Sequence, residues 1–166
     1  MEEFSDTEQK ELLIEGDDSP HTILLVEDNE ELLQILNSLF SPTYRVLLAR
    51  NGKEGLEKAR AERPDIIVSD VMMPEMNGFD LCRKIKSDIV LSHLPVMLLT
   101  ALSDDKQQMY GAASGADAYI QKPFNIEVVK LRIIKLLEDR VRLREAYARD
   151  VSSPAVSVKE EKAGSM

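Results

Sequence analysis

Residues 68–78, VSDVMMPEMNG, contain an apolar run that stops at an acid, Asp70, and is followed at once by a proline and an Asn-Gly turn signal. A short apolar run bounded by turn signals is typical of a buried strand. Open α/β sheets bind their ligands in the crevice beyond the carboxyl ends of the strands. Asp70 is therefore either an acid that begins a turn or the reactive group of the protein.

Apolar runs alternate with segments of helical period on both sides of this stretch. The predicted strands are residues 22–26, 44–49, 65–70, 95–101 and 118–121, and the predicted helices are residues 30–40, 52–63, 78–87, 104–115 and 125–150. This alternation predicts an α/β fold with a doubly wound parallel sheet and helices on both faces. Continuous apolar runs fit strands that are buried on both faces. Because crossovers are right-handed, all the strand ends are expected at one edge of the sheet.

The apolar positions of three helices predict which side chains face the sheet. In the helix over residues 30–40, the inward residues are expected to be Leu32, Leu33, Ile35, Leu36 and Leu39. In the last helix, most of Ile126, Val129, Ile133, Leu136 and Leu137 are expected to pack on the sheet. Cys82 shares a helical face with Phe79 and Ile85, so we interpret it as a packing residue rather than a nucleophile.

The chain is expected to hold one domain with flanking segments. Its 166 residues suit a single domain with tails. Residues 1–20 and 151–166 are predicted to be linkers or disordered tails, because they are polar and show no sustained period. Residues 21–138 form the predicted domain, and residues 139–150 continue the last helix as an extension.

The composition argues against several classes of protein. A net charge of −9 does not suit a nucleic-acid-binding surface, which is normally basic. The single cysteine, Cys82, provides no disulfide framework and no cysteine-rich metal site. No stretch has the apolar length of a membrane span, and the acidic first residues lack the profile of a signal peptide. The expected location is the cytoplasm.

Polar residues gather at the expected strand ends. Glu27 and Asp28 follow the first strand, Asp70 ends the third, Thr100 and Ala101 end the fourth, and Lys122 and Pro123 follow the fifth. Each has an ordinary explanation, such as a helix cap for Asp28 or a solvated side chain for Lys122. Two like charges about 4 Å apart repel by roughly 4 kcal/mol at an effective dielectric near 20, so three carboxylates at one edge need cations. Lys122 and one hard divalent ion such as Mg²⁺ would bring the charge to zero.

These motifs, taken in order, resemble the receiver domain of two-component response regulators. The matching stretches are VEDN (residues 26–29), DVMMPEMNG (70–78), LLTA (98–101) and KPF (122–124), and the resemblance covers about residues 20–140. It implies a flavodoxin-like sheet with strand order 2-1-3-4-5. The implied function is a phosphorylation-activated switch in a two-component phosphorelay, which is a signalling domain and not an enzyme.

The resemblance implies the chemistry of the acidic cluster. Asp70 would be the phosphoacceptor, which takes a phosphoryl group from a phosphohistidine of a partner kinase. Mg²⁺ would be bound by Asp28, Asp70 and the backbone carbonyl of Met72, with Glu27 assisting through water. Lys122 would pair with the Asp70 carboxylate and then with a phosphoryl oxygen.

The resemblance also implies how the phosphorylated state is relayed. Thr100 and the backbone N–H of Ala101 would donate to phosphoryl oxygens, and Thr100 would move toward them. Tyr119 would then turn inward and change the surface formed by residues 104–115, 118–121 and the last helix. The bond between Lys122 and Pro123 is expected to be cis.

Two other classes of protein share part of this pattern. A phosphatase of the haloacid-dehalogenase type also uses a strand-end Asp and Mg²⁺, but it usually has a second Asp two residues further on, where this chain has Met72. A nucleotide-binding protein needs a glycine-rich phosphate loop, whereas the stretch VEDNEE (residues 26–31) is acidic and repels phosphates. His21 and His93 lack the helical context of a kinase phosphodonor.

The expected partners follow from the same interpretation. They are the phosphodonor domain of a histidine kinase and, upon phosphorylation, a second copy of this chain in a weak dimer through the last helix. No DNA or membrane binding is expected of this chain itself. The helical extension and the leading residues predict that the chain is one module of a longer protein. The stretch LRIIKLLEDRVRLREAY (residues 131–147) resembles the end of receivers in hybrid sensors, and this resemblance implies a kinase upstream and an AraC-type DNA-binding domain downstream. A single-domain regulator with a frayed tail is the alternative.

Overall fold

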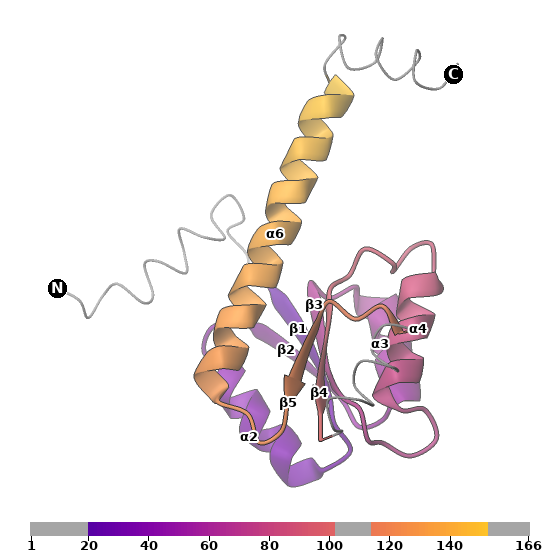
Figure 1. The fold of residues 1–166 in the computed structure, drawn as a ribbon, viewed down its shortest axis with the longest axis vertical. Helices are drawn as coiled ribbons and strands as arrows, with labels where there is room; N and C mark the ends of the chain where they lie inside the picture. The colour runs from indigo at the N-terminus through magenta and orange to yellow at the C-terminus, as the bar shows by residue number, and fades with distance from the viewer. Residues whose placement is uncertain (1–19, 102–113, 153–166) are drawn as a thin grey trace, which may run out of the picture.

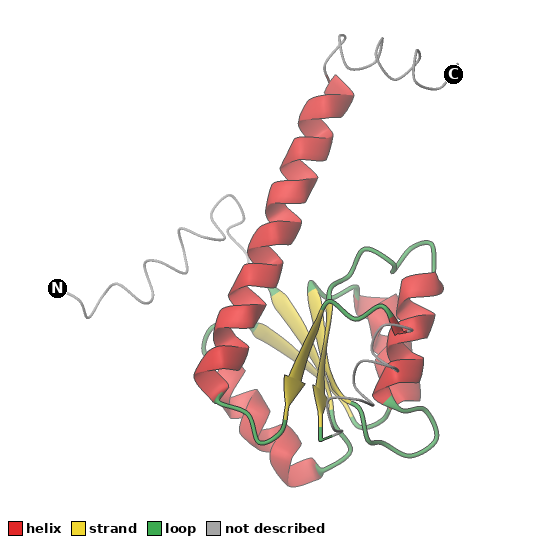
Figure 2. Ribbon diagram, in the orientation of Figure 1, coloured by secondary structure: helices red, strands yellow, loops and turns green. Residues whose placement is uncertain are grey.

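A parallel sheet of five strands in the order β2-β1-β3-β4-β5 forms the centre of the protein (Figures 1 and 2). The computed structural model describes residues 20–101 and 114–152, with side chains described as far as residue 146. The strands are β1 (Thr22–Val26), β2 (Arg45–Ala49), β3 (Ile66–Asp70), β4 (Val96–Thr100) and β5 (Ala118–Gln121). The predicted fold class and strand order are confirmed.

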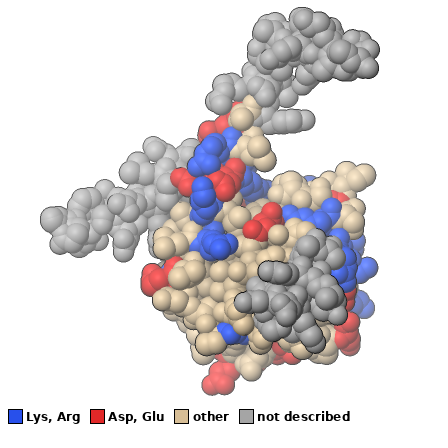
Figure 3. Space-filling view, in the orientation of Figure 1, with Lys and Arg blue, Asp and Glu red and all other residues tan. Residues whose placement is uncertain are grey.

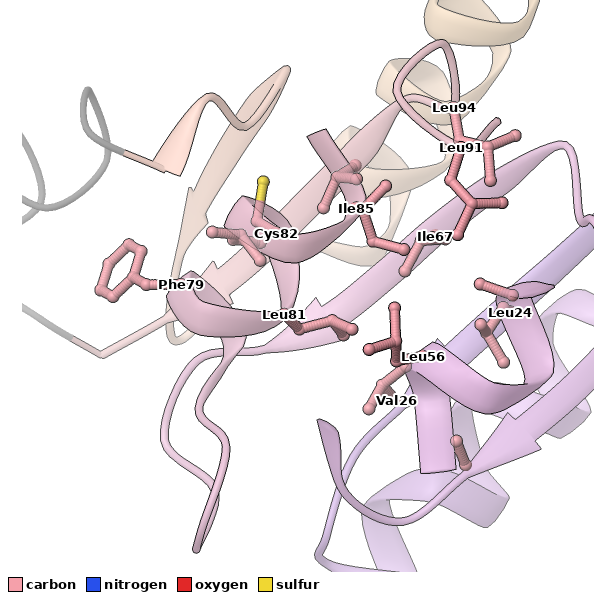
Figure 4. Close-up of a cluster of buried hydrophobic side chains, with 14 of the residues drawn as sticks. Leu24, Val26, Leu56, Ile67, Phe79, Leu81, Cys82, Ile85, Leu91 and Leu94 are labelled. Atoms are coloured by element: carbon pink, nitrogen blue, oxygen red, sulfur yellow. The ribbon is translucent and has the colours of Figure 1, made fainter. Parts of the chain in front are cut away.

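Helices cover both faces of the sheet (Figure 1). They are α2 (Glu30–Phe40), α3 (Gly52–Glu62), α4 (Gly78–Ser87) and α6 (Ile126–Ser152). Side chains of α2 and α6 share one buried cluster with the sheet, while side chains of α3 and α4 share the other. Figure 4 shows the second cluster, which contains Phe79, Cys82 and Ile85 of α4 together with sheet residues such as Val26 and Ile67. The helix predicted over residues 104–115 lies outside the described residues except for its last two positions.

An asparagine caps the amino end of each of the helices α2, α3 and α4. The side chains of Asn29, Asn51 and Asn77 accept a hydrogen bond from the backbone N–H three residues later, at 2.8–2.9 Å. This is the usual way to satisfy the free donors of a first helical turn. Because Asn29 caps α2, the ordinary explanation of Asp28 as that cap is wrong, and Asp28 is exposed beside the end of β1.

Three details differ from the pattern-based predictions. Ile35 of α2 is 49% exposed, because the buried face of this helix is narrower than predicted and consists of Leu33, Leu36 and Phe40. Strand β2 is only half-buried, since it lies at the edge of the sheet and has a neighbour on one side. Helix α6 continues to Ser152, two residues beyond the predicted end. Its sheet-facing residues were predicted correctly, with Val129, Ile133 and Leu137 buried and Ile126 and Leu136 partly buried.

Asp65 ties the first strand to the last helix at the amino edge of the sheet. One carboxylate oxygen accepts a hydrogen bond from the backbone N–H of Thr22 at 2.7 Å and lies 3.5 Å from Nδ1 of the buried His21. The other carboxylate oxygen accepts a hydrogen bond from Nη1 of Arg140 at 3.1 Å. The same Nη1 also donates to the backbone carbonyl of Asp65 at 2.8 Å. Arg140 therefore fixes α6 against the sheet at the beginning of the extension. We call these four residues the Asp65 clamp.

Replacing Asp65 with Asn is expected to lower the free energy of unfolding at pH 7 by about 1–3 kcal/mol, because it removes a charge-assisted hydrogen bond from a partly buried network. Burial alone would raise the pKa of Asp65, but the contact with His21, the hydrogen bond from Thr22 and the charge of Arg140 lower it below its ordinary 3.8. A carboxylate whose pKa is lowered by folding stabilises the folded state at a pH above its ordinary pKa. This stabilisation is lost as the pH falls through the lowered pKa of the folded state.

Urea unfolding of wild type and Asp65→Asn between pH 7 and pH 3 measures this effect. The difference in stability should be largest at neutral pH and should narrow below about pH 4. Asp139→Asn is the matched control, since Asp139 is half-exposed on α6 and its ion pairs, with Arg142 at 2.8 Å and Lys135 at 3.4 Å, lie at the surface. A difference that grows as the pH falls would contradict the assignment.

Candidate functional site

Three carboxylates meet where β1 and β3 end. Glu27 and Asp28 follow β1, Asp70 is the last residue of β3, and one oxygen from each lies within 4.8 Å of the others. Glu27 and Asp70 are 3% and 4% exposed, whereas Asp28 faces solvent. The strand-end acids that are distant in the sequence are therefore neighbours, as the edge argument predicted.

Lys122 brings a positive charge into this cluster from the residue after β5. Its Nζ lies 2.6 Å from Oδ1 of Asp70 and 3.9 Å from Oε1 of Glu27. Its backbone N–H donates to the carbonyl of Thr100 at 2.7 Å, so β4 and β5 hold the lysine in place. The peptide bond between Lys122 and Pro123 is cis. Lys122 is thus an ion-pair partner of a buried acid and not a solvated side chain.

Burial dominates the electrostatics of the two inner acids. Burial raises the pKa of Glu27 to about 7, and the charge of Asp70 adds to this, although the backbone N–H of Asn29 donates to Glu27 at 3.1 Å and opposes it. Burial likewise raises the pKa of Asp70, while its pairing with Lys122 opposes the change and the charge of Asp28 reinforces it. The charge of Lys122 lowers both pKa values but does not offset the effect of burial.

The cluster suits a hard divalent cation. Among the described residues, the buried Oε1 of Glu27 and Oδ1 of Asp70 have no polar partner besides the Lys122 ammonium. The available ligand atoms are oxygens, which Mg²⁺ prefers, and three ionised carboxylates with one ammonium leave two negative charges for the ion to neutralise. The residues present therefore fit the Mg²⁺ that the resemblance implies. Met72, whose carbonyl was the expected fourth ligand, lies two residues beyond Asp70 in the loop after β3.

Gly78 lets the start of α4 approach the end of β3. Its N–H donates to the carbonyl of Val71 at 2.9 Å. A Cβ at this position would overlap the backbone oxygen of Asp70 and lie 2.8 Å from Cα of Val71. The loop between them also contains Glu75, a non-glycine residue with a left-handed φ of 69°. Glycine is required here because the loop that begins at Asp70 returns onto its own strand.

The expected relay residues lie on the two strands beyond Asp70. Thr100 is fully buried at the end of β4, next to Leu99, the register partner of Asp70. Ala101 follows it and is exposed. Tyr119 of β5 is partly buried opposite Leu98, and its hydroxyl lies 3.1 Å from Oγ of Ser114.

Two contacts around the site have no signal in the sequence. Arg50, which follows β2, holds Glu30 at the start of α2 with two hydrogen bonds of 2.8 and 3.2 Å. Ser114, which is 2% exposed, contacts Tyr119. No spacing or motif distinguishes these two residues from ordinary polar residues, because each contact depends on how separate elements approach one another.

Comparison with known proteins identifies the class of protein that this fold and acidic site define. Residues 23–134 match the family model of the response regulator receiver domain, and the chain belongs to this family. It is therefore a signalling domain of two-component systems. The match gives no support to the phosphatase alternative.

The chain is similar to histidine kinases and to response regulators. It is 47% identical over 127 residues to Histidine kinase P4 of Formosa agariphila, covering 76% of this chain and 9% of that protein. It is 39% identical over 133 residues to Response regulator PleD of Caulobacter vibrioides, covering 76% of this chain and 29% of that protein. The chain thus spans a minor part of these relatives.

A solved structure shares the architecture at similar identity. The signal receiver domain of a signal transduction histidine kinase from Syntrophus aciditrophicus superposes with a TM-score of 0.68 at 38% identity, covering 72% of this chain and 91% of that one. Within the described residues, no helix combines the length and the apolar character needed to cross a membrane.

Proposed function

We propose that Asp70 is the phosphoacceptor of this receiver and takes its phosphoryl group from a phosphohistidine of a histidine kinase. The observation that carries the proposal is the buried Asp70 carboxylate, which lies 2.6 Å from the Lys122 ammonium inside an acidic cluster. Asp70 lies at a strand end, pairs with one cation and has room in its charge balance for a second. This arrangement suits phosphoryl transfer, in which positioning and charge neutralisation provide the catalysis.

The chemistry follows from the groups around Asp70. One carboxylate oxygen attacks phosphorus, the P–N bond of the donor breaks, and its electron pair returns to the imidazole. Lys122 moves its charge from the carboxylate to a phosphoryl oxygen as the acyl phosphate forms. The Thr100 hydroxyl and the Ala101 N–H donate to the remaining oxygens, in the manner of an oxyanion hole.

A divalent ion completes the charge balance of the site. Asp28 and Asp70 would hold Mg²⁺ together with the carbonyl of Met72, while Glu27 assists through water. When bound, Mg²⁺ supplies the positive charge that draws the anionic phosphoryl group toward the carboxylates.

The phosphorylated state would be relayed through Thr100 and Tyr119. Phosphorylation replaces one negative charge by about two at neutral pH, so the site gains acceptor oxygens and an unmet charge. Thr100 moves toward these oxygens, and the Tyr119 ring turns into the space that Thr100 leaves. The surface over β5 and α6 then changes shape, which is the output of the switch.

Intact mass spectrometry after incubation with phosphoramidate and Mg²⁺ tests the proposal. The chain should gain the mass of one phosphoryl group, and Asp70→Asn should gain none. Removing Mg²⁺ with a chelator should also stop the reaction, because the acids then repel the phosphoryl donor. A persistent adduct on the Asn variant would exclude Asp70 as the acceptor.

The wider partners of the chain belong to the same proposal. The receiver would act in the cytoplasm, where kinase phosphohistidines are formed from ATP, and within a hybrid sensor like the kinases it resembles.

Phosphorylation would strengthen a weak dimer through α6, whose Val128 and Leu131 are 46% and 65% exposed beside the helix's mixed charges (Figure 3). Sedimentation with and without beryllofluoride measures this; an unchanged monomer at high concentration would exclude the dimer.

A further inference from the structure

A buried serine contacts the hydroxyl of the switch tyrosine. Oγ of Ser114 lies 3.1 Å from the hydroxyl of Tyr119, and either oxygen can be the donor. Ser114 is 2% exposed and Tyr119 is partly buried, so this hydrogen bond is partly shielded from bulk water. The Tyr119 ring packs against the buried cluster on the α3 and α4 face of the sheet. The observed orientation of Tyr119 is therefore held at its hydroxyl as well as at its ring.

Ser114 also connects Tyr119 to helix α4. The Cys82 thiol, fully buried in α4, has its pKa raised to about 11 by burial, while a hydrogen bond with Ser114 opposes this rise. Helix α4 begins at Gly78, whose N–H donates a hydrogen bond to the carbonyl of Val71, the residue after Asp70. The contacts thus run from the loop of the acidic site, through α4 and Ser114, to β5.

We propose that Ser114 is a latch that holds Tyr119 in the resting orientation and sets how readily the switch moves. The inference rests on the proposed function, in which Tyr119 turns toward the space beside Thr100. When Tyr119 turns, its hydroxyl leaves Ser114, and this hydrogen bond is lost. Ser114 is a positioning residue, since it contacts neither the phosphoryl group nor Asp70.

The latch predicts the sign and size of a shift in population. Breaking one neutral hydrogen bond shifts an equilibrium about fivefold, the scale of roughly 1 kcal/mol. Ser114→Ala should therefore lower the beryllofluoride concentration for half-conversion about fivefold, because ligand binding no longer has to break this bond. Tyr119→Phe keeps the ring and loses the hydroxyl, so it should have a similar effect. The double variant should show no further gain, since both changes remove the same bond.

Amide NMR of β5, with Mg²⁺ and increasing beryllofluoride, measures the conversion in the full chain. Ser87→Ala is the matched control, because Ser87 lies at the exposed end of α4 and its hydroxyl contacts only the carbonyl of Lys84, at 3.3 Å, among the described residues. Thermal unfolding of each variant establishes that it is folded.

The outcomes separate the latch from the switch. A fivefold shift in both single variants, without further gain in the double variant, supports the latch. Wild-type conversion with an unchanged midpoint in Ser114→Ala and Tyr119→Phe overturns the latch and leaves the proposed function in place. If beryllofluoride leaves the β5 amides of wild type unmoved, the proposed relay fails, and the latch fails with it.

Discussion

Lys122→Ala is expected to slow the phosphorylation of Asp70 by about 10²–10³-fold, the usual cost of removing one preorganised group that stabilises transition-state charge. The structure shows why the loss should be so large. Nζ of Lys122 lies 2.6 Å from Asp70 and 3.9 Å from Glu27, and no other ion pair to either acid is formed within the described residues. Without this lysine, the cluster repels the incoming phosphoryl group.

Thr100→Ala should behave differently, because Thr100 reports the phosphoryl group rather than neutralising it. We expect it to slow phosphorylation by less than about tenfold, the scale of one neutral hydrogen bond. The response of the β5 amides to beryllofluoride should be lost. Phosphoramidate kinetics followed by intact mass, together with NMR, measure both properties for each variant.

Lys135→Ala is the control for the loss of a lysine, since Lys135 lies on α6, is 61% exposed and pairs with Asp139. It should leave the rate unchanged. Identical profiles for the Lys122 and Thr100 variants would refute this division of labour.

Gly78→Ala is expected to destabilise the fold by about 3 kcal/mol, at the upper end of the usual cost of overpacking. The added Cβ would meet the backbone oxygen of Asp70 and Cα of Val71, and backbone atoms cannot rotate away as a side chain can. Relief requires that α4 or the end of β3 moves. Since Asp70 lies on that strand end, phosphorylation of the folded variant should also slow.

Gly55→Ala is the matched control, because the substitution is the same and Gly55 also lies in a helix, α3. There the new Cβ would lie 3.0 Å from Cγ2 of Val26, which is a longer contact and one with a side chain instead of the backbone, and alanine gains helix propensity of up to about 1 kcal/mol. Denaturant unfolding of the three proteins gives the comparison. Equal stabilities for Gly78→Ala and wild type would show that the close approach of α4 is not needed.

The sheet and the acidic cluster were predictable because both depend on short-range patterns. Apolar runs that alternate with helical segments determine a parallel sheet, and its crossovers bring the strand ends to one edge. For this reason Glu27, Asp70 and Lys122 were expected to be neighbours, and their measured distances agree.

Other features depend on distances and angles that a pattern does not encode. The exposure of Ile35 reflects how much of α2 rests on the sheet, and helical period alone overestimated the width of the buried face of this helix. The contact of Arg140 with Asp65 joins residues 75 positions apart and depends on the angle at which α6 crosses the sheet. The contact of Ser114 with Tyr119 depends on the path of the chain just before β5.

The Asp65 clamp gives the last helix the mechanics of a lever. Arg140 fastens α6 to the sheet, and beyond this fulcrum the helix projects from the domain to Ser152 (Figure 1). At 1.5 Å per residue, the projecting arm is about 18 Å long, and a tilt of roughly 10° at the clamp would move its tip by about 3 Å. A small change of packing beside β5 would thus be magnified at the far end of the arm, and weakening the fulcrum would dissipate that motion before it reached the tip.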